Sequence, residues 1–155
     1  WNLDGTAGGE RMLTAIKSDG PAVIGLRAIQ ALFERDYKTA STLFRSAIAS
    51  KDDSLLPVSL CGYVPANVEW QPLLALSEQR NGAPGAAAES YRQVQGRAQA
   101  ALSEPQANRN VEAAWHVALS WADAGLGEHD QAVAEALRAS ERNLESSKQR
   151  AQEAR

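Results

Sequence analysis

The stretch "ADAGLGEHDQAVAEALRASE", residues 122–141, decides the fold because it contains two glycines, several acidic residues and one of the two histidines. It is either a loop that holds a metal ion or a phosphate, or a corner between two helices. Adjacent residues of one corner point in different directions, and no second histidine or cysteine lies at ligand spacing. Acidic side chains at a helix start instead complement its free N–H groups. We therefore interpret Glu128, His129 and Asp130 as the start of a helix and expect no metal site.

A spacing of small residues within this stretch occurs three times in the chain. Each copy has an alanine, a residue four positions later and another three positions after that: Ala40, Phe44 and Ala47; Ala87, Tyr91 and Val94; Ala132, Ala136 and Ala139. A corner precedes each copy, at 35–36, 82 and 127. Two antiparallel helices pack closely where small residues let their backbones approach, and one such pair cannot bury its apolar side alone. The spacing therefore predicts an all-α fold of stacked antiparallel helix pairs.

The rest of the chain has the same organisation. Pro21 opens an apolar pattern of helical period, Asn110 is a candidate helix N-cap, and Val133, Leu137 and Leu144 continue the pattern in the last helix. No segment alternates in the manner of a strand. We expect an end of a preceding repeat or a linker at 1–20, three helix pairs at about 21–50, 66–103 and 110–142, and a polar helical tail at 143–155.

Two segments, "GLGEHDQAVAEALRA" at 125–139 and "RDYKTASTLFRSAIA" at 35–49, resemble the tetratricopeptide family, in which a corner precedes an alanine-anchored second helix. The resemblance covers residues 21–142 and implies a right-handed α-solenoid. The anchoring alanines are 47 and 45 residues apart, against about 34 in that family, and other α-solenoids have units of about 40–47 residues. Glu78 and Asp123 stand where an aromatic residue is usual. The segment "EAAWHVALSWADAGLGEHDQA" also resembles the C-terminal repeat regions of large bacterial regulators, which carry a kinase, cyclase or winged-helix DNA-binding domain at the other end.

The resemblance implies recognition of a protein or peptide in a groove that the first helix of each pair lines. Trp121 lies between Ser120 and Ala122, which we assign to helix contacts, so its side chain either lines the groove or packs in the core. The second helices would lie on the convex side, with Arg92 and Glu135 solvated. Four residues are the candidates for the groove: Ile29, Leu76, Gln79 and Trp121.

The alternative function is a structural spacer or an oligomerisation unit, such as a homodimer, with no ligand of its own. Such a unit should expose a large apolar patch at one edge of the stack. A recognition groove should instead expose apolar or aromatic groups on its concave side.

The other chemistry-bearing residues form no catalytic arrangement, so we expect neither an enzyme nor a cofactor. The glycine-rich segment "GTAGGE" at 5–10 lacks the lysine of a phosphate loop. Cys61 has no basic partner nearby in the sequence. His116, Trp70 and Trp115 fit the interior of helix pairs.

Composition limits the partners and the setting. A net charge of −3 and a pI near 5.4 provide no basic surface for nucleic acid. No apolar run reaches the ~18 residues of a membrane span. We therefore expect a soluble domain, with the cytoplasm favoured over the periplasm. Because the chain opens at Trp1 and ends within a helical pattern, we expect it to be part of a longer protein.

Overall fold

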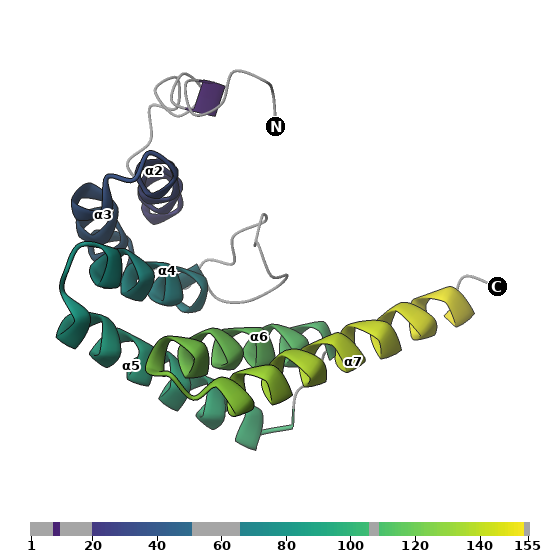
Figure 1. Ribbon diagram of the computed structural model, residues 1–155. Coiled ribbons are helices and arrows are strands. Elements are labelled where there is room, and N and C mark those ends of the chain that lie inside the picture. The colour runs from purple at the N-terminus through teal and green to yellow at the C-terminus, as the bar shows by residue number, and fades with distance from the viewer. Residues whose placement is uncertain (1–7, 10–19, 51–65, 106–108, 154–155) are drawn as a thin grey trace.

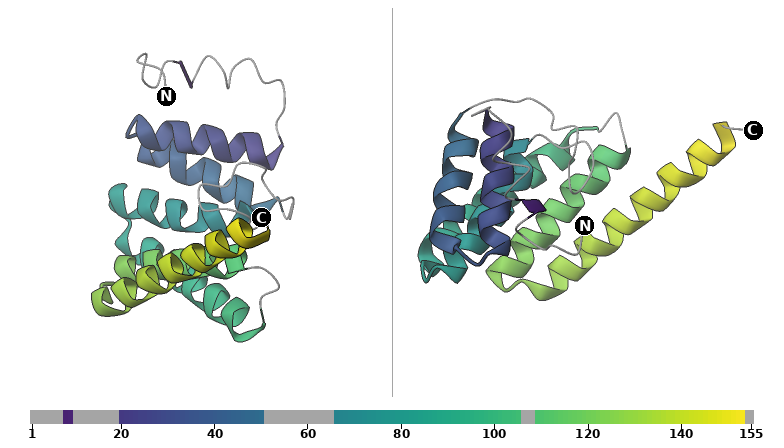
Figure 2. Two further views of the ribbon diagram at one scale, coloured as in Figure 1. Left: turned by 90° about the vertical axis from the view of Figure 1, so that its right-hand side faces the viewer. Right: turned by 90° about the horizontal axis from the view of Figure 1, so that it is seen from above.

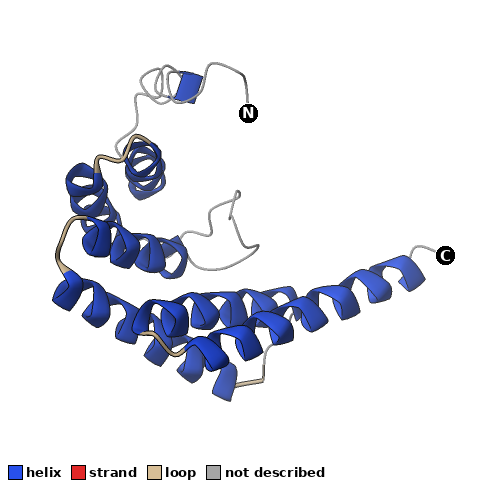
Figure 3. Cartoon of the chain, in the orientation of Figure 1, coloured by secondary structure: helices blue, strands red, loops and turns tan. Residues whose placement is uncertain are grey.

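The computed structural model describes residues 8–9, 20–50, 66–105 and 109–153, and within these ranges the chain is helical without any strand (Figures 1 and 3). The predicted all-α class is therefore confirmed. Gly8 and Gly9 have helical geometry. The six longer helices are α2 (Pro21–Phe33), α3 (Tyr37–Ala49), α4 (Ala66–Arg80), α5 (Pro84–Ser103), α6 (Arg109–Leu126) and α7 (His129–Glu153).

Three corners of the same construction join α2 to α3, α4 to α5 and α6 to α7. Each corner has one residue in the left-handed region, namely Arg35 with φ 63°, Gly82 with φ 78° and Gly127 with φ 85°. The backbone N–H of the following residue donates a hydrogen bond to the carbonyl five residues earlier. The three bonds run from Asp36 to Ala31, from Ala83 to Glu78 and from Glu128 to Asp123, at 2.8–2.9 Å. This is the Schellman type of helix end. Glycine adopts such a φ freely, whereas Arg35 does so at a cost in strain.

The helices follow one another along an arc, and each packs against the next (Figure 1). The first helices also contact one another, α2 with α4 and α4 with α6. The second helices, α3, α5 and α7, make no contact with one another within the described residues. The first helices therefore form one continuous layer, and each second helix covers it separately.

Two apolar clusters fill the contacts between helices. Phe44, Trp70 and the alanines around them join α2, α3 and α4, and Tyr91 and Val94 join α5 to α4 and α6. Glycines make room for the two large rings. A methyl group at Gly25 would collide with the ring of Trp70, and one at Gly125 would collide with Tyr91. Burial raises the pKa of the Tyr91 hydroxyl.

The anchoring alanines of all three copies, Ala40, Ala87 and Ala132, are buried. The third copy departs from the predicted pattern in its second position. Ala136 is exposed, and the adjacent Glu135 is buried instead. The expectation that Glu135 is solvated was therefore wrong, because this carboxylate has partners on α6 and on its own helix.

Helix α6 begins one residue earlier than the predicted cap, so Asn110 lies within its first turn. At the other end of the chain, α7 continues to Glu153 and projects beyond the packed body (Figure 2). The segments 1–7, 10–19 and 51–65 lie outside the described residues, and with them Cys61, most of "GTAGGE" and the predicted linker or repeat end at 1–20. No helix in the described part of the chain is both long and apolar enough to cross a membrane.

Candidate functional site

The four groove candidates lie on the three first helices that form the continuous layer. Ile29 is on α2, Leu76 and Gln79 are on α4, and Trp121 is on α6. Three of them share one position relative to the corners. They are Ile29, Leu76 and Trp121, which directly follow the small residues Ala28, Ala75 and Ser120. Each of the three precedes the left-handed corner residue of its helix pair by six positions. We call these three residues the inner row.

Exposure differs along the inner row. Ile29 is half-buried against the first apolar cluster, and Leu76 is also half-buried. Trp121 is the most exposed of the three, at 44%. Gln79 is exposed near the end of α4, where its carbonyl accepts a hydrogen bond from the Gly82 N–H at 3.2 Å. An apolar row on first helices therefore ends in an accessible indole.

The neighbours of Trp121 hold it in place from two sides. The Ser120 hydroxyl donates to the Ala132 carbonyl of α7 at 2.8 Å. Ala122 is fully buried in the cluster that α6 shares with α5. Because successive helical residues are about 100° apart, a side chain between two such contacts points away from both. The exposed indole is thus fixed on a helix whose rotation is determined on two sides. Trp70 is buried, and Trp115 packs against the second cluster.

Two buried carboxylates lie at matching positions of α4 and α6, each four residues before the left-handed corner residue. Glu78 accepts hydrogen bonds from Arg45 and from the Ser90 hydroxyl, both at 2.7 Å. Asp123 accepts one from the Gln95 amide at 2.9 Å. Each carboxylate therefore joins a first helix to a second helix by hydrogen bonds.

Charge is balanced at Glu78 but not at Asp123. Burial is the main cause that raises the pKa of Asp123, and the charges of Glu128 and Glu135 add to it, while the Gln95 hydrogen bond opposes it. The amide of Gln95 also donates to Glu128 at 2.9 Å, so two carboxylates share one neutral donor. Neither Gln95 nor any described neighbour supplies Asp123 with a formal positive charge.

A polar network joins α6 to the side of α7 that faces it. The His116 ring lies 2.6 Å from the Glu135 carboxylate, which also accepts from Arg138. Further along, Arg142 donates to Glu112 at 2.8 Å and to Glu145 at 3.2 Å. These contacts join side chains of α6 to side chains of α7, so the network holds the two helices together. Sequence analysis placed His116 inside a helix pair but did not identify Glu135 as its partner.

The start of α7 has no cation-binding geometry. Glu128, His129 and Asp130 are all exposed, and within the described ranges no three histidine, cysteine or acidic side chains are grouped so that they could hold a metal ion. Asp130 lies in the first turn of α7, where a negative charge interacts favourably with the helix dipole.

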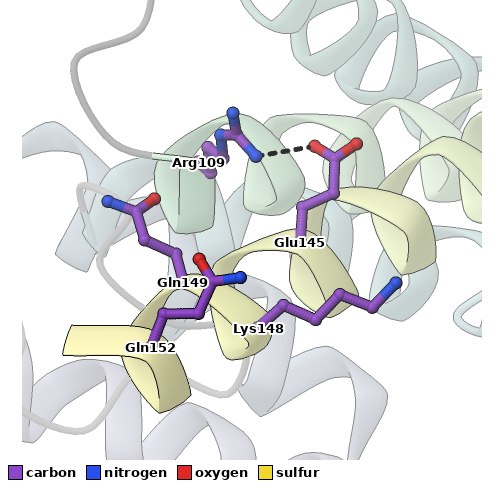
Figure 4. A pocket seen from close by; sticks show the side chains of 5 residues that line it. All are labelled: Arg109, Glu145, Lys148, Gln149 and Gln152. Atoms are coloured by element: carbon purple, nitrogen blue, oxygen red, sulfur yellow. Dashed lines mark hydrogen bonds and ion pairs between the residues drawn. The ribbon is translucent and has the colours of Figure 1, made fainter. Parts of the chain in front are cut away.

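An open hollow of about 370 Å³ lies where the first turn of α6 meets the last turns of α7 (Figure 4). The ion pair from Arg109 to Glu145, at 3.0 Å, spans it. Its other lining side chains are long and polar: Lys148, Gln149 and Gln152. Sequence analysis missed this hollow because it depends on residues about 36 positions apart.

The outward side of α7 exposes three large apolar residues. Val133 and Leu137 are each 60% exposed, and Leu144 is 57% exposed. In the sequence these residues supported the helix prediction, and such a pattern normally marks the buried side. The structure buries the opposite side, which consists of Ala132, Glu135, Ala139 and Ser146. We call Val133, Leu137, Ser140 and Leu144 the outer face of α7.

No protein family, no curated protein and no solved structure matches this chain.

Proposed function

We propose that this chain is a tetratricopeptide-like helical-repeat module that recognises a protein or peptide along its inner row. The exposure of Trp121 carries the proposal: an indole stays accessible on a helix that is held firmly by its two flanking residues. Large amphipathic side chains of this kind dominate recognition surfaces. Ile29 and Leu76 extend the apolar surface to the neighbouring first helices, and Gln79 supplies a polar group beside it.

Three features support the solenoid architecture on which this proposal rests. The left-handed corner residues Arg35, Gly82 and Gly127 are 47 and 45 residues apart, the same intervals as the anchoring alanines. The three corners share one pattern of hydrogen bonds. The first helices contact one another while the second helices do not, which gives the layer of first helices a continuous surface.

Selection of binding peptides from a random library against the purified chain tests the proposal. Binders should lose about 30-fold in affinity to Trp121→Ala, which corresponds to the ~2 kcal/mol of a recognition hot spot. Leu76→Ala should weaken binding less. The matched control is Val133→Ala, an exposed apolar residue away from the inner row, which should leave affinity unchanged. Circular dichroism should show that all three variants keep their helices.

Two outcomes would contradict the recognition function. Peptides that bind Trp121→Ala as tightly as the unchanged chain would place the binding surface elsewhere. A selection that yields no binder would favour the second candidate function, a spacer or oligomerisation unit. The specific observation behind that second candidate is the apolar outer face of α7, at the edge of the stack.

A further inference from the structure

We propose that the outer face of α7 binds the same face of a second copy of this chain, with the two α7 helices antiparallel. This dimer does not depend on ligand recognition by the inner row, because the two surfaces lie on different helices. The contacts made by α7 itself suggest it. Helix α7 already contacts α6 through its opposite side, so the exposed apolar residues of its outer face are available for another partner.

The spacing along the outer face is that of a helix-pairing seam. Val133, Leu137, Ser140 and Leu144 follow one another at intervals of four, three and four residues, and the exposed Ser147 and Ala151 continue the series. Alternation of three and four keeps one row of side chains facing a partner helix, as in a coiled coil.

The series also indicates the register. An antiparallel partner that places Val133 opposite Leu144 of the second copy also places Leu137 opposite Ser140 of the second copy. All three large residues of each copy are then covered, and each packs beside a residue of different size. Shifting either helix by one heptad leaves Val133 or Leu144 without an apolar neighbour.

Charge favours this antiparallel register over a parallel one. Asp130 precedes Val133 by three residues and so continues the outer-face series at its N-terminal end, and Lys148 follows Ser147 near the other end; both are exposed. Neither takes part in an ion pair within the described residues. In the antiparallel register Asp130 lies beside Lys148 of the second copy at both ends of the seam. In a parallel pair, like charges would lie at the same level.

Sedimentation velocity of the 155-residue chain tests the association. Dimer should form with rising concentration over about 1–100 µM. Leu137→Glu should raise the dissociation constant by about 30-fold or more, because it places a carboxylate at the centre of the seam. The matched control is Phe33→Glu on α2, where the phenylalanine is also 60% exposed, and this variant should dimerise as before. A chain that stays monomeric, or a Leu137→Glu variant that dimerises normally, would overturn the proposal.

Crosslinking tests the register. In a Cys61→Ser background, Val133→Cys and Leu144→Cys variants are prepared separately and then oxidised alone and as a mixture. The mixture should form a covalent dimer. Neither variant should do so alone, because like positions lie about 16 Å apart along the antiparallel seam. A covalent dimer of Val133→Cys alone would show parallel helices and overturn the proposal, and so would a mixture that does not crosslink.

Discussion

The centre of the chain buries large rings, whereas the described part of the last helix buries none. Helices α3, α4 and α5 contribute Phe44, Trp70 and Tyr91 to the buried clusters. Helix α7 instead buries alanines together with Glu135 and Ser146, and turns Val133 and Leu137 outward. Both regions have the same short corners and the same anchoring alanine, so the backbone arrangement does not explain the difference.

The difference shows that two kinds of interaction hold the helices of this chain together. In the centre, large apolar groups leave water, which is the main favourable contribution to folding. At α7 the contact with α6 relies on small residues that allow close approach and on hydrogen bonds such as that of His116 with Glu135. Paired polar groups contribute less net stability than buried apolar groups of similar size. The large apolar residues of α7 therefore remain available for binding.

The largest expected effect on the free energy of unfolding comes from removing a buried ring in the centre of the chain. Phe44→Ala removes a fully buried ring and should lower the free energy of unfolding by about 3–5 kcal/mol. Leu137→Ala, which also truncates a large apolar residue, should change it by less than about 0.5 kcal/mol in dilute solution, because the side chain is already largely in water. Urea unfolding followed by circular dichroism measures both. Equal losses would remove the distinction between the two regions.

A smaller effect is expected where a ring packs on a glycine. Gly25→Ala places a methyl group against the ring of Trp70 and should cost about 1–3 kcal/mol through overpacking. Gly96→Ala, in the middle of α5, has open space around its added methyl and should stabilise the helix by up to about 1 kcal/mol. Thermal unfolding should move in opposite directions for the two variants. A Gly25→Ala protein as stable as the unchanged chain would mean that Trp70 does not pack there.

The smallest expected effect concerns the two buried carboxylates and depends on pH. Because burial raises the pKa of Asp123 above 3.8, the folded chain holds this proton more tightly than the unfolded chain. The contribution of the Asp123 carboxyl group to stability is therefore present below pH 3.8 and is lost as pH rises through the raised pKa. Asp123→Asn should remove this loss and stabilise the chain at pH 7.

The matched variant is Glu78→Gln, which removes a charge that Arg45 neutralises. It should destabilise the chain at pH 7, because the arginine loses its charged partner. Urea midpoints measured from about pH 4 to pH 7 compare the two variants with the unchanged chain. An Asp123→Asn effect that is destabilising and constant with pH would contradict the role assigned to burial.

The helices could be predicted from sequence, but which side of the last one is buried could not. Helical period, Pro21 and the corner glycines predicted helices close to those observed, and the all-α class is confirmed. The same period in α7 indicates an apolar side without indicating what covers it. That side is exposed because α6 contacts the opposite one, through a pairing of His116 with Glu135 that spans 19 positions. No local pattern predicts such a contact.

The inner row was partly predictable for a related reason. Ser120 and Ala122 are small, and small residues at close helix contacts leave the residue between them on another side, as Trp121 shows. The partners of Glu78 and Asp123 could not be predicted, since Arg45 and Gln95 come from neighbouring units. Whether the inner row binds a partner remains a prediction.

One pair of variants tests most directly the claim that α7 packs through its small, polar side and leaves its apolar side for binding. Ala139→Glu and Leu137→Glu place the same charge on α7, two residues and about 200° apart. In dilute solution, urea unfolding should show that Ala139→Glu lowers the free energy of unfolding by about 3 kcal/mol or more, because it buries an unpaired carboxylate against α6. Leu137→Glu should change it by less than about 0.5 kcal/mol. A Leu137→Glu chain that unfolds as readily as Ala139→Glu, or an Ala139→Glu chain as stable as the unchanged protein, would contradict this assignment of the two sides.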